Sequence, residues 1–225
     1  MIRALLAGAI LAAPPALAGS VTPVEYDDMA AQLSGHVDFE SYPTLPEPGL
    51  ALTGPLVFPG LSIGARLRGQ SIESTDGFEL LTGQPTLPLI ADIGGKAAVL
   101  AVAFHAGFGS TAGFPLGPDG FAQRSGRGEG ALAFVFDGTI TGFALKLHAD
   151  YADPLGARPQ PGPVMLTFFA PSGHEIARHT VTPAHGVTKI AVQVTPPAAA
   201  ITLTHRDPGG IAIDDIRYSL DSPGS

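Results

Sequence analysis

Two adjacent carboxylates near the C-terminus have the residue types and spacing that suit a hard cation. Asp214 and Asp215 lie in the segment 210–216, where the alternation of apolar and polar residues slips by one position. Ile213 and Ile216 can both face a core only if the backbone bulges at the aspartates, and bulges re-aim side chains. Calcium takes about six to eight oxygen ligands, many of them carboxylate oxygens. We expect either a structural calcium ion here or an acidic pair that faces solvent and accepts local hydrogen bonds.

A second polar group follows an expected strand at 143–148. His148, Asp150, Tyr151 and Asp153 lie at the end of this strand and lead into a segment rich in Pro and Gly. Their side chains can bind a cation or hydrogen-bond a polyol, so we predict that they bind a ligand. The alternative is an ordinary turn, in which Asp is favoured for hydrogen bonds to its own backbone.

The seven histidines show no helical zinc spacing, because neither His-x-x-x-His nor His-Glu-x-x-His occurs. His105 and His148 flank two long irregular stretches, and we predict that they contribute to one ligand-binding site. Residues 60–64 have the spacing Gly-x-Ser-x-Gly, but an expected strand at 63–68 follows them instead of the helix that a nucleophile elbow requires. Ser110 lies in a Gly-rich segment close to His105, but without the strand–turn–helix context that a nucleophile elbow requires. A secreted hydrolase is therefore the least favoured function.

The composition excludes several classes of protein. The 225 residues include 12 Lys and Arg against 20 Asp and Glu, which gives a formal net charge of −8. A negative surface disfavours nucleic acid as a partner. The absence of cysteine excludes disulfides, thiolate nucleophiles and Cys-ligated metal sites. The 29 Gly and 22 Pro favour an all-β protein with many turns.

The elements that must position these side chains are predicted mainly by a hydrophobic period of two. The expected strands lie at 36–40, 63–68, 99–105, 132–136, 143–148, 164–169, 176–181, 188–194, 201–205 and 211–218. This pattern predicts an all-β fold, a two-sheet antiparallel β-sandwich of the jelly-roll type. The capping-box sequence Thr22-Pro23-Val24-Glu25 predicts a short helix over residues 23–33. Residues 73–95 and 106–130 break the rhythm and are expected to be long surface or ligand-facing loops.

The N-terminus has the composition of a secretory signal peptide. Arg3 precedes the apolar residues 5–13, and Ala16-Leu17-Ala18 matches the small-x-small cleavage pattern. No later segment is apolar over the roughly 20 residues that a membrane span requires. We therefore expect export to the periplasm or the medium. The expected divisions are a signal peptide at 1–18, an N-terminal segment with a short helix at 19–35, a β-sandwich at 36–219 and a flexible tail at 220–225.

Four short motifs resemble those of a known group of secreted domains. Residues 37–40 (Val-Asp-Phe-Glu) and 210–216 resemble the first and last strands of galactose-binding-like carbohydrate-binding modules. Residues 138–145 and 164–173 resemble an inner strand and a hairpin of the same domains. Exported bacterial proteins of the PEP-CTERM type carry similar domains, although residues 221–225 (Asp-Ser-Pro-Gly-Ser) do not have the pattern of a Pro-Glu-Pro sorting tail.

The resemblance implies a jelly roll and a structural calcium ion bound by Glu40 and Asp215, with Asp214 as a further ligand. It also implies a secreted, non-catalytic module that binds a glycan or another cell-surface component. The sequence contains no Trp and only four Tyr, the side chains that most favour stacking on sugar rings. The alternative function is a structural or protein-interaction domain of the envelope or matrix.

Overall fold

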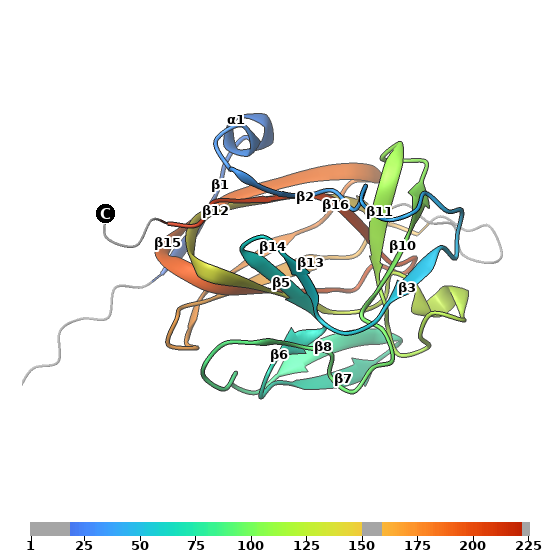
Figure 1. The fold of residues 1–225 in the computed structure, drawn as a ribbon, viewed down its shortest axis with the longest axis horizontal. Helices are drawn as coiled ribbons and strands as arrows, with labels where there is room; N and C mark the ends of the chain where they lie inside the picture. The colour runs from blue at the N-terminus through green and yellow to red at the C-terminus, as the bar shows by residue number, and fades with distance from the viewer. Residues whose placement is uncertain (1–18, 150–158, 222–225) are drawn as a thin grey trace, which may run out of the picture.

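Antiparallel β-strands make up most of the protein. The computed structural model describes residues 19–149 and 159–221, and in them one short α-helix accompanies the strands. Two β-layers pack face to face around one core, as Figure 1 shows. The prediction of an all-β antiparallel sandwich is confirmed. Within the described residues, no helix is both long enough and apolar enough to cross a membrane.

Two long strands belong to both layers. β12 (Leu132–Ala149) pairs with β15 (Gly186–His205) at both of its ends, with shifts of register between Val135 and Gly142. The sequence predicted four separate strands for these residues. The strands predicted at 132–136 and 143–148 are both part of β12, and those predicted at 188–194 and 201–205 are both part of β15. Pro196 and Pro197 lie at the bend of β15. Proline has no N–H group to donate, so the hydrogen-bond ladder is interrupted there.

The two layers share β12 and β15 and differ in the strands on either side. The first layer has the order β14 (Glu175–Val181), β13 (Val164–Phe169), β15, β12, β5 (Leu61–Gly64), β4 (Leu56–Phe58). The second has the order β1 (Ser20–Pro23), β15, β12, β16 (Ala212–Tyr218), β11 (Ser110–Pro115), β10 (Leu100–His105), β3 (Leu50–Leu52), and β2 (Gly35–Val37) pairs with the end of β16.

The core lies between the layers and is rich in phenylalanine and branched aliphatic residues. Phe134, Phe143 and Phe168 are fully buried in it. Close packing of such side chains is the main favourable contribution to folding. On β13 the residues that face this core alternate with residues on the outer face of the first layer, as the period of a strand requires. That outer face is the one that carries the groove described below.

Two small β-elements lie against the outside of the first layer. They are the hairpin of β7 (Ser71–Thr75) with β8 (Phe78–Thr82), and the pair β6 (Arg66–Leu67) with β9 (Ala91–Asp92). Asp76 and Gly77 both have positive φ, at 53° and 85°, as the two-residue turn of a tight hairpin requires. The sequence predicted a long loop at residues 73–95. The structure instead places β-strands in much of this stretch. Residues 106–130 also contain a strand, β11, as well as the 3-10 turn η1 (Arg124–Gly126).

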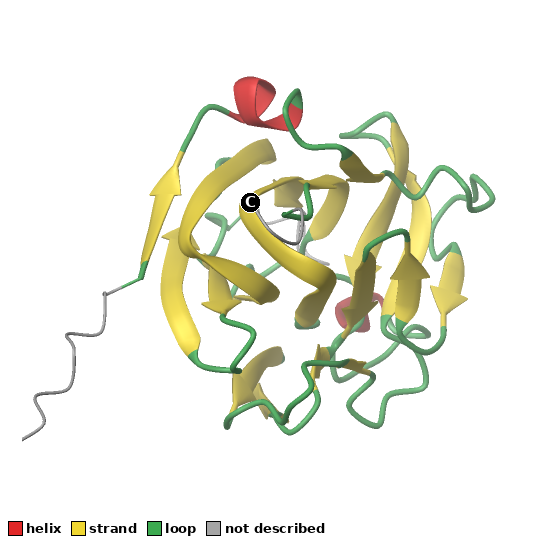
Figure 2. Ribbon diagram, turned by 60° about the vertical axis from the view of Figure 1, so that its left-hand side comes forward, coloured by secondary structure: helices red, strands yellow, loops and turns green. Residues whose placement is uncertain are grey.

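The α-helix found in residues 19–149 and 159–221 is shorter than predicted. α1 (Tyr26–Ala30) begins after the predicted capping box, because Thr22 and Pro23 belong to β1 and pair with β15. Glu25 is the N-cap residue and its side chain makes no capping hydrogen bond. Tyr26 and Met29 pack on Ala144 and Ala191, so the helix covers the outside of the second layer (Figure 2).

Candidate functional site

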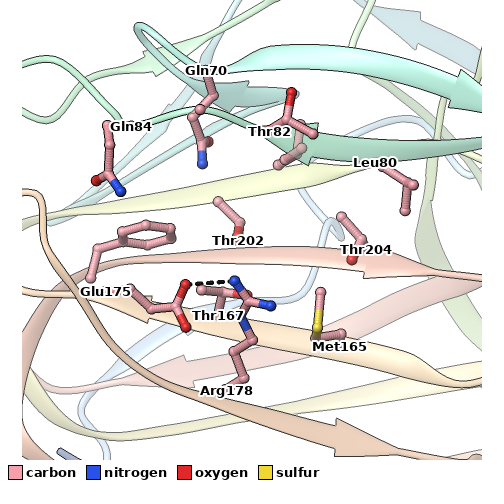
Figure 3. A pocket seen from close by; sticks show the side chains of 13 residues that line it. Gln70, Leu80, Thr82, Gln84, Met165, Thr167, Glu175, Arg178, Thr202 and Thr204 are labelled. Atoms are coloured by element: carbon pink, nitrogen blue, oxygen red, sulfur yellow. Dashed lines mark hydrogen bonds and ion pairs between the residues drawn. The ribbon is translucent and has the colours of Figure 1, made fainter.

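A groove of about 460 Å³ runs along the outer face of the first layer. Its floor is formed by β13 and β15, its outer edge by β14, and its opposite wall by β8 and the residues after it (Figure 3). The residues that line it are Gln70, Leu80, Leu81, Thr82, Gly83, Gln84, Met165, Thr167, Phe169, Glu175, Arg178, Thr202 and Thr204. This volume lies in the range of about 300–1,000 Å³ that is usual for small-ligand sites.

The strand register sets the floor of the groove. Thr167 on β13 lies directly opposite Thr202 on β15, and Met165 lies opposite Thr204. Side chains two residues apart share a face, and neighbouring strands lie about 4.8 Å apart, so these four side chains form two adjacent rows. Threonine suits a strand, and its branched β-carbon restricts the directions in which its hydroxyl can point.

The three threonine hydroxyls are available to a ligand. Thr167, Thr202 and Thr204 are 7 %, 4 % and 6 % exposed, which places them at the bottom of the groove. Within residues 19–149 and 159–221, none of these hydroxyls makes a hydrogen bond to another protein group. Because a polar group that loses water without gaining a partner costs free energy, a ligand with hydroxyl groups of its own suits this floor.

Gln70 faces the threonines from the wall. The residue is 4 % exposed, and its Oε1 accepts a hydrogen bond from the backbone N–H of Leu67 at 3.1 Å. This bond fixes the orientation of the amide, because an N–H group requires the oxygen as its acceptor. The amide nitrogen therefore points toward Thr202, as Figure 3 shows, and Gln84 and Thr82 add further neutral polar groups.

A buried ion pair holds the wall in place. Glu79 on β8 is 3 % exposed, and its Oε2 accepts hydrogen bonds from Lys96 Nζ at 2.5 Å and from the Ala131 N–H at 2.9 Å. Lys96 also donates to the backbone oxygen of Leu116, and its burial lowers the pKa of its ammonium group. The hairpin is thus tied to the body of the sandwich through one carboxylate. Neither Glu79 nor Lys96 was predicted from the sequence to have a structural role.

The pair of charges at the groove lies on β14, the edge strand. Arg178 Nη2 donates to Glu175 Oε2 at 2.8 Å, and this hydrogen bond raises the pKa of the guanidinium further above its usual range. The remainder of the groove lining is uncharged.

The predicted bulge at the aspartate pair is present in β16. Asp215 has a positive φ of 49°, and the register between β12 and β16 shifts between Ala144 and Lys146. The carboxylate of Asp215 contacts three basic side chains, namely Arg217 Nε at 2.6 Å, Lys146 Nζ at 2.8 Å and His36 Nε2 at 2.9 Å. Burial alone would raise the pKa of Asp215, but the hydrogen bonds from Lys146 and Arg217 hold it well below its usual range.

Asp214 and Glu40 both accept hydrogen bonds from the beginning of β11. Asp214 Oδ2 accepts a hydrogen bond from the Ser110 hydroxyl at 2.7 Å, and Glu40 Oε1 accepts one from the Thr111 N–H at 2.7 Å. In the described part of the chain, no three His, Asp or Glu side chains are grouped so that they could hold a metal ion. Asp215 is paired with basic side chains in this structure, and calcium binding at these carboxylates stays a prediction.

The structure brings His105 and His148 together. Their ring centroids lie 4.3 Å apart at an interplanar angle of 62°. His105 Nδ1 accepts a hydrogen bond from the Gly107 N–H at 3.0 Å, and burial together with His148 lowers the pKa of His105 to about 4. A second pocket of about 460 Å³ lies beside them and is also lined by Glu47 and Phe104. Ligand binding there stays a prediction.

Three predicted site residues, Asp150, Tyr151 and Asp153, lie outside the described residues. Conversely, no residue of the groove was predicted from the sequence to bind a ligand. The sequence does indicate a polar face on the strand predicted at 201–205, because Thr202 and Thr204 alternate with Ile201 and Leu203. The sequence does not show that a distant hairpin forms a wall above this face.

Comparisons with known proteins identify no family. No protein-family model and no curated protein matches the sequence. Two solved structures of mutants of a family 29 carbohydrate-binding module do match. The first is 13% identical, with a TM-score of 0.34 over 56% of this chain and 84% of that chain. The second, complexed with mannohexaose, is 12% identical, with a TM-score of 0.33 over 69% of this chain and 94% of that chain.

Proposed function

We propose that this protein is a non-catalytic module that binds a neutral glycan in the groove between β8 and the outer face of β13 and β15. The observation that carries the proposal is the floor of threonine hydroxyls, which lies opposite a glutamine amide of fixed orientation. Each hydroxyl can donate and accept a hydrogen bond, and a sugar hydroxyl can do the same.

The charge and the apolar residues of the groove favour a neutral sugar over other ligands. A polyanion would be repelled by the net charge of −8. Met165 and Phe169 supply apolar surface for the C–H groups of a sugar ring. The groove thus offers both kinds of contact that a pyranose needs, although the sequence contains no tryptophan.

The carboxylate content of the groove favours binding without catalysis. Most glycoside hydrolases use two carboxyl groups on either side of the scissile bond. Among the described residues that line the groove, Glu175 is the one carboxylate, and it is paired with Arg178. The proposal further places the protein outside the cytoplasm, on the basis of the predicted signal peptide at 1–18, and makes a cell-surface glycan its partner.

Affinity electrophoresis against a panel of neutral soluble polysaccharides tests this function. We expect the wild-type protein to be retarded by at least one of them. Thr202→Val removes a hydroxyl at nearly constant volume and should weaken binding by roughly 2–10-fold, the value of one neutral hydrogen bond. Thr22→Val, on exposed strand β1 of the other layer, is the matched control and should bind like the wild type. Absence of retardation, or equal binding by the Thr202 variant, would contradict the proposal.

A further inference from the structure

The Glu175–Arg178 pair reaches the groove because of an irregularity in β14. Residues three apart on a regular strand point to opposite faces of a sheet. Here the register between β13 and β14 shifts, so that Arg178 lies opposite Thr167 and Glu175 lies opposite Phe169. Both charged side chains therefore lie on the face that carries the groove, beside Thr167 (Figure 3). Bulges of this kind commonly re-aim side chains next to binding sites.

The pair retains free hydrogen-bonding capacity. The 2.8 Å contact uses one guanidinium nitrogen and one carboxylate oxygen. Glu175 Oε1 can still accept, and the other N–H groups of Arg178 can still donate. The side chains are 38 % and 58 % exposed, so a ligand in the groove can reach both. An exposed ion pair contributes only about 0–1 kcal/mol to the stability of the fold. Its position at the groove therefore says more about its role than its contribution to stability does.

We propose that Glu175 and Arg178 bind two hydroxyls on adjacent carbons of the glycan, an inference that rests on the proposed function. One hydroxyl donates to the Glu175 carboxylate, and its neighbour accepts from the Arg178 guanidinium. The two protein groups lie side by side at 2.8 Å, as do hydroxyls on adjacent carbons of one ring. Hydrogen bonds to charged groups are stronger than neutral ones, so this pair contributes more to selectivity than each threonine.

This arrangement selects the linkage of the glycan. A pyranose linked through carbons 1 and 4 keeps free hydroxyls on carbons 2 and 3, which are adjacent. A pyranose linked through carbons 1 and 3 keeps them on carbons 2 and 4, which are not adjacent. The ligand is therefore a neutral glycan whose linkage leaves adjacent hydroxyls free, as a 1,4 linkage does, rather than a 1,3-linked glycan. A uronic acid is disfavoured by the net charge of −8.

Affinity electrophoresis with two linkage classes tests the assignment. The 1,4-linked probes are deacetylated glucomannan and amylose, and the 1,3-linked probe is a long linear β-1,3-glucan, in which chain ends are scarce. We expect the wild-type protein to bind one 1,4-linked probe at least tenfold more tightly than the 1,3-glucan. Glu175→Gln and Arg178→Gln should each weaken that binding by roughly tenfold and leave the 1,3-glucan unaffected. Asp27→Asn removes an exposed ion pair with Lys189 and is the control without effect.

The outcomes separate the two proposals. Binding of the 1,3-glucan as tightly as the 1,4-linked probes would overturn the diol assignment and leave the proposed function standing. The diol assignment would also be overturned, and the proposed function would stand, if the variants kept the wild-type preference for 1,4-linked probes. Equal loss of binding to both linkage classes would lead to the same conclusion. A wild-type protein that binds none of these probes but is retarded by another neutral polysaccharide would overturn the diol assignment alone. A protein that no neutral polysaccharide retards would overturn the proposed function as well.

Discussion

At the scale of single residues, Asp215 combines an unusual backbone conformation with an unusual set of contacts. Its positive φ belongs to the bulge that the slipped alternation of residues 210–216 predicted. Two of its three basic partners were not predictable, because Lys146 and His36 lie on other strands and meet Asp215 only through the strand register. A local irregularity can thus be predicted from sequence, whereas the charges that surround it cannot.

These contacts make the stability contributed by Asp215 depend on pH. The folded-state pKa lies below the unfolded value of about 3.9, so the contribution is present above pH 4 and is lost as the pH falls through the folded value. Asp215→Asn removes the charge, and asparagine tolerates positive φ. In urea unfolding, the variant should be less stable than the wild type at pH 7, and the difference should narrow at pH 3. A difference that is independent of pH would show that the charge is not involved.

At the scale of elements, the sequence predicted regular strands well and irregular ones poorly. The strand at 164–169 has the predicted bounds, and the one predicted at 176–181 begins one residue earlier. β11 was missed because it contains Gly113 and Pro115, which are uncommon inside strands. The β7–β8 hairpin was missed because most of β7 is polar and exposed, although its Asp-Gly turn was visible. This hairpin is the element that converts an open sheet face into a groove.

The attachment of the hairpin can be tested through its buried ion pair. Glu79→Ala leaves the ammonium group of Lys96 buried without its carboxylate, which should cost about 3–5 kcal/mol of stability in urea unfolding. The double variant Glu79→Leu with Lys96→Met replaces both charges by apolar groups and should recover much of that loss. If the double variant were as unstable as the single one, the loss would come from the Ala131 hydrogen bond instead.

At the scale of the whole molecule, the groove is assembled from three distant stretches of chain. Residues 70–84 supply the wall, residues 165–178 supply part of the floor and the edge, and Thr202 with Thr204 complete the floor. The alternation of residues 201–204 marks a polar face on β15, although no residue of that face was predicted to bind a ligand. Periodicity carries no information about which element lies opposite that face. The layers themselves follow from β12 and β15, each of which bends from one sheet into the other.

Backbone amide chemical-shift perturbation tests the location of the ligand most directly. The labelled protein would be titrated with hexaoses prepared from deacetylated glucomannan, amylose and β-1,3-glucan. With at least one 1,4-linked hexaose, we predict that the largest shifts occur at Gln70, Thr167 and Thr202. No saturable shifts with any hexaose, or shifts concentrated around His105 and His148, would contradict the assignment of glycan binding to this groove.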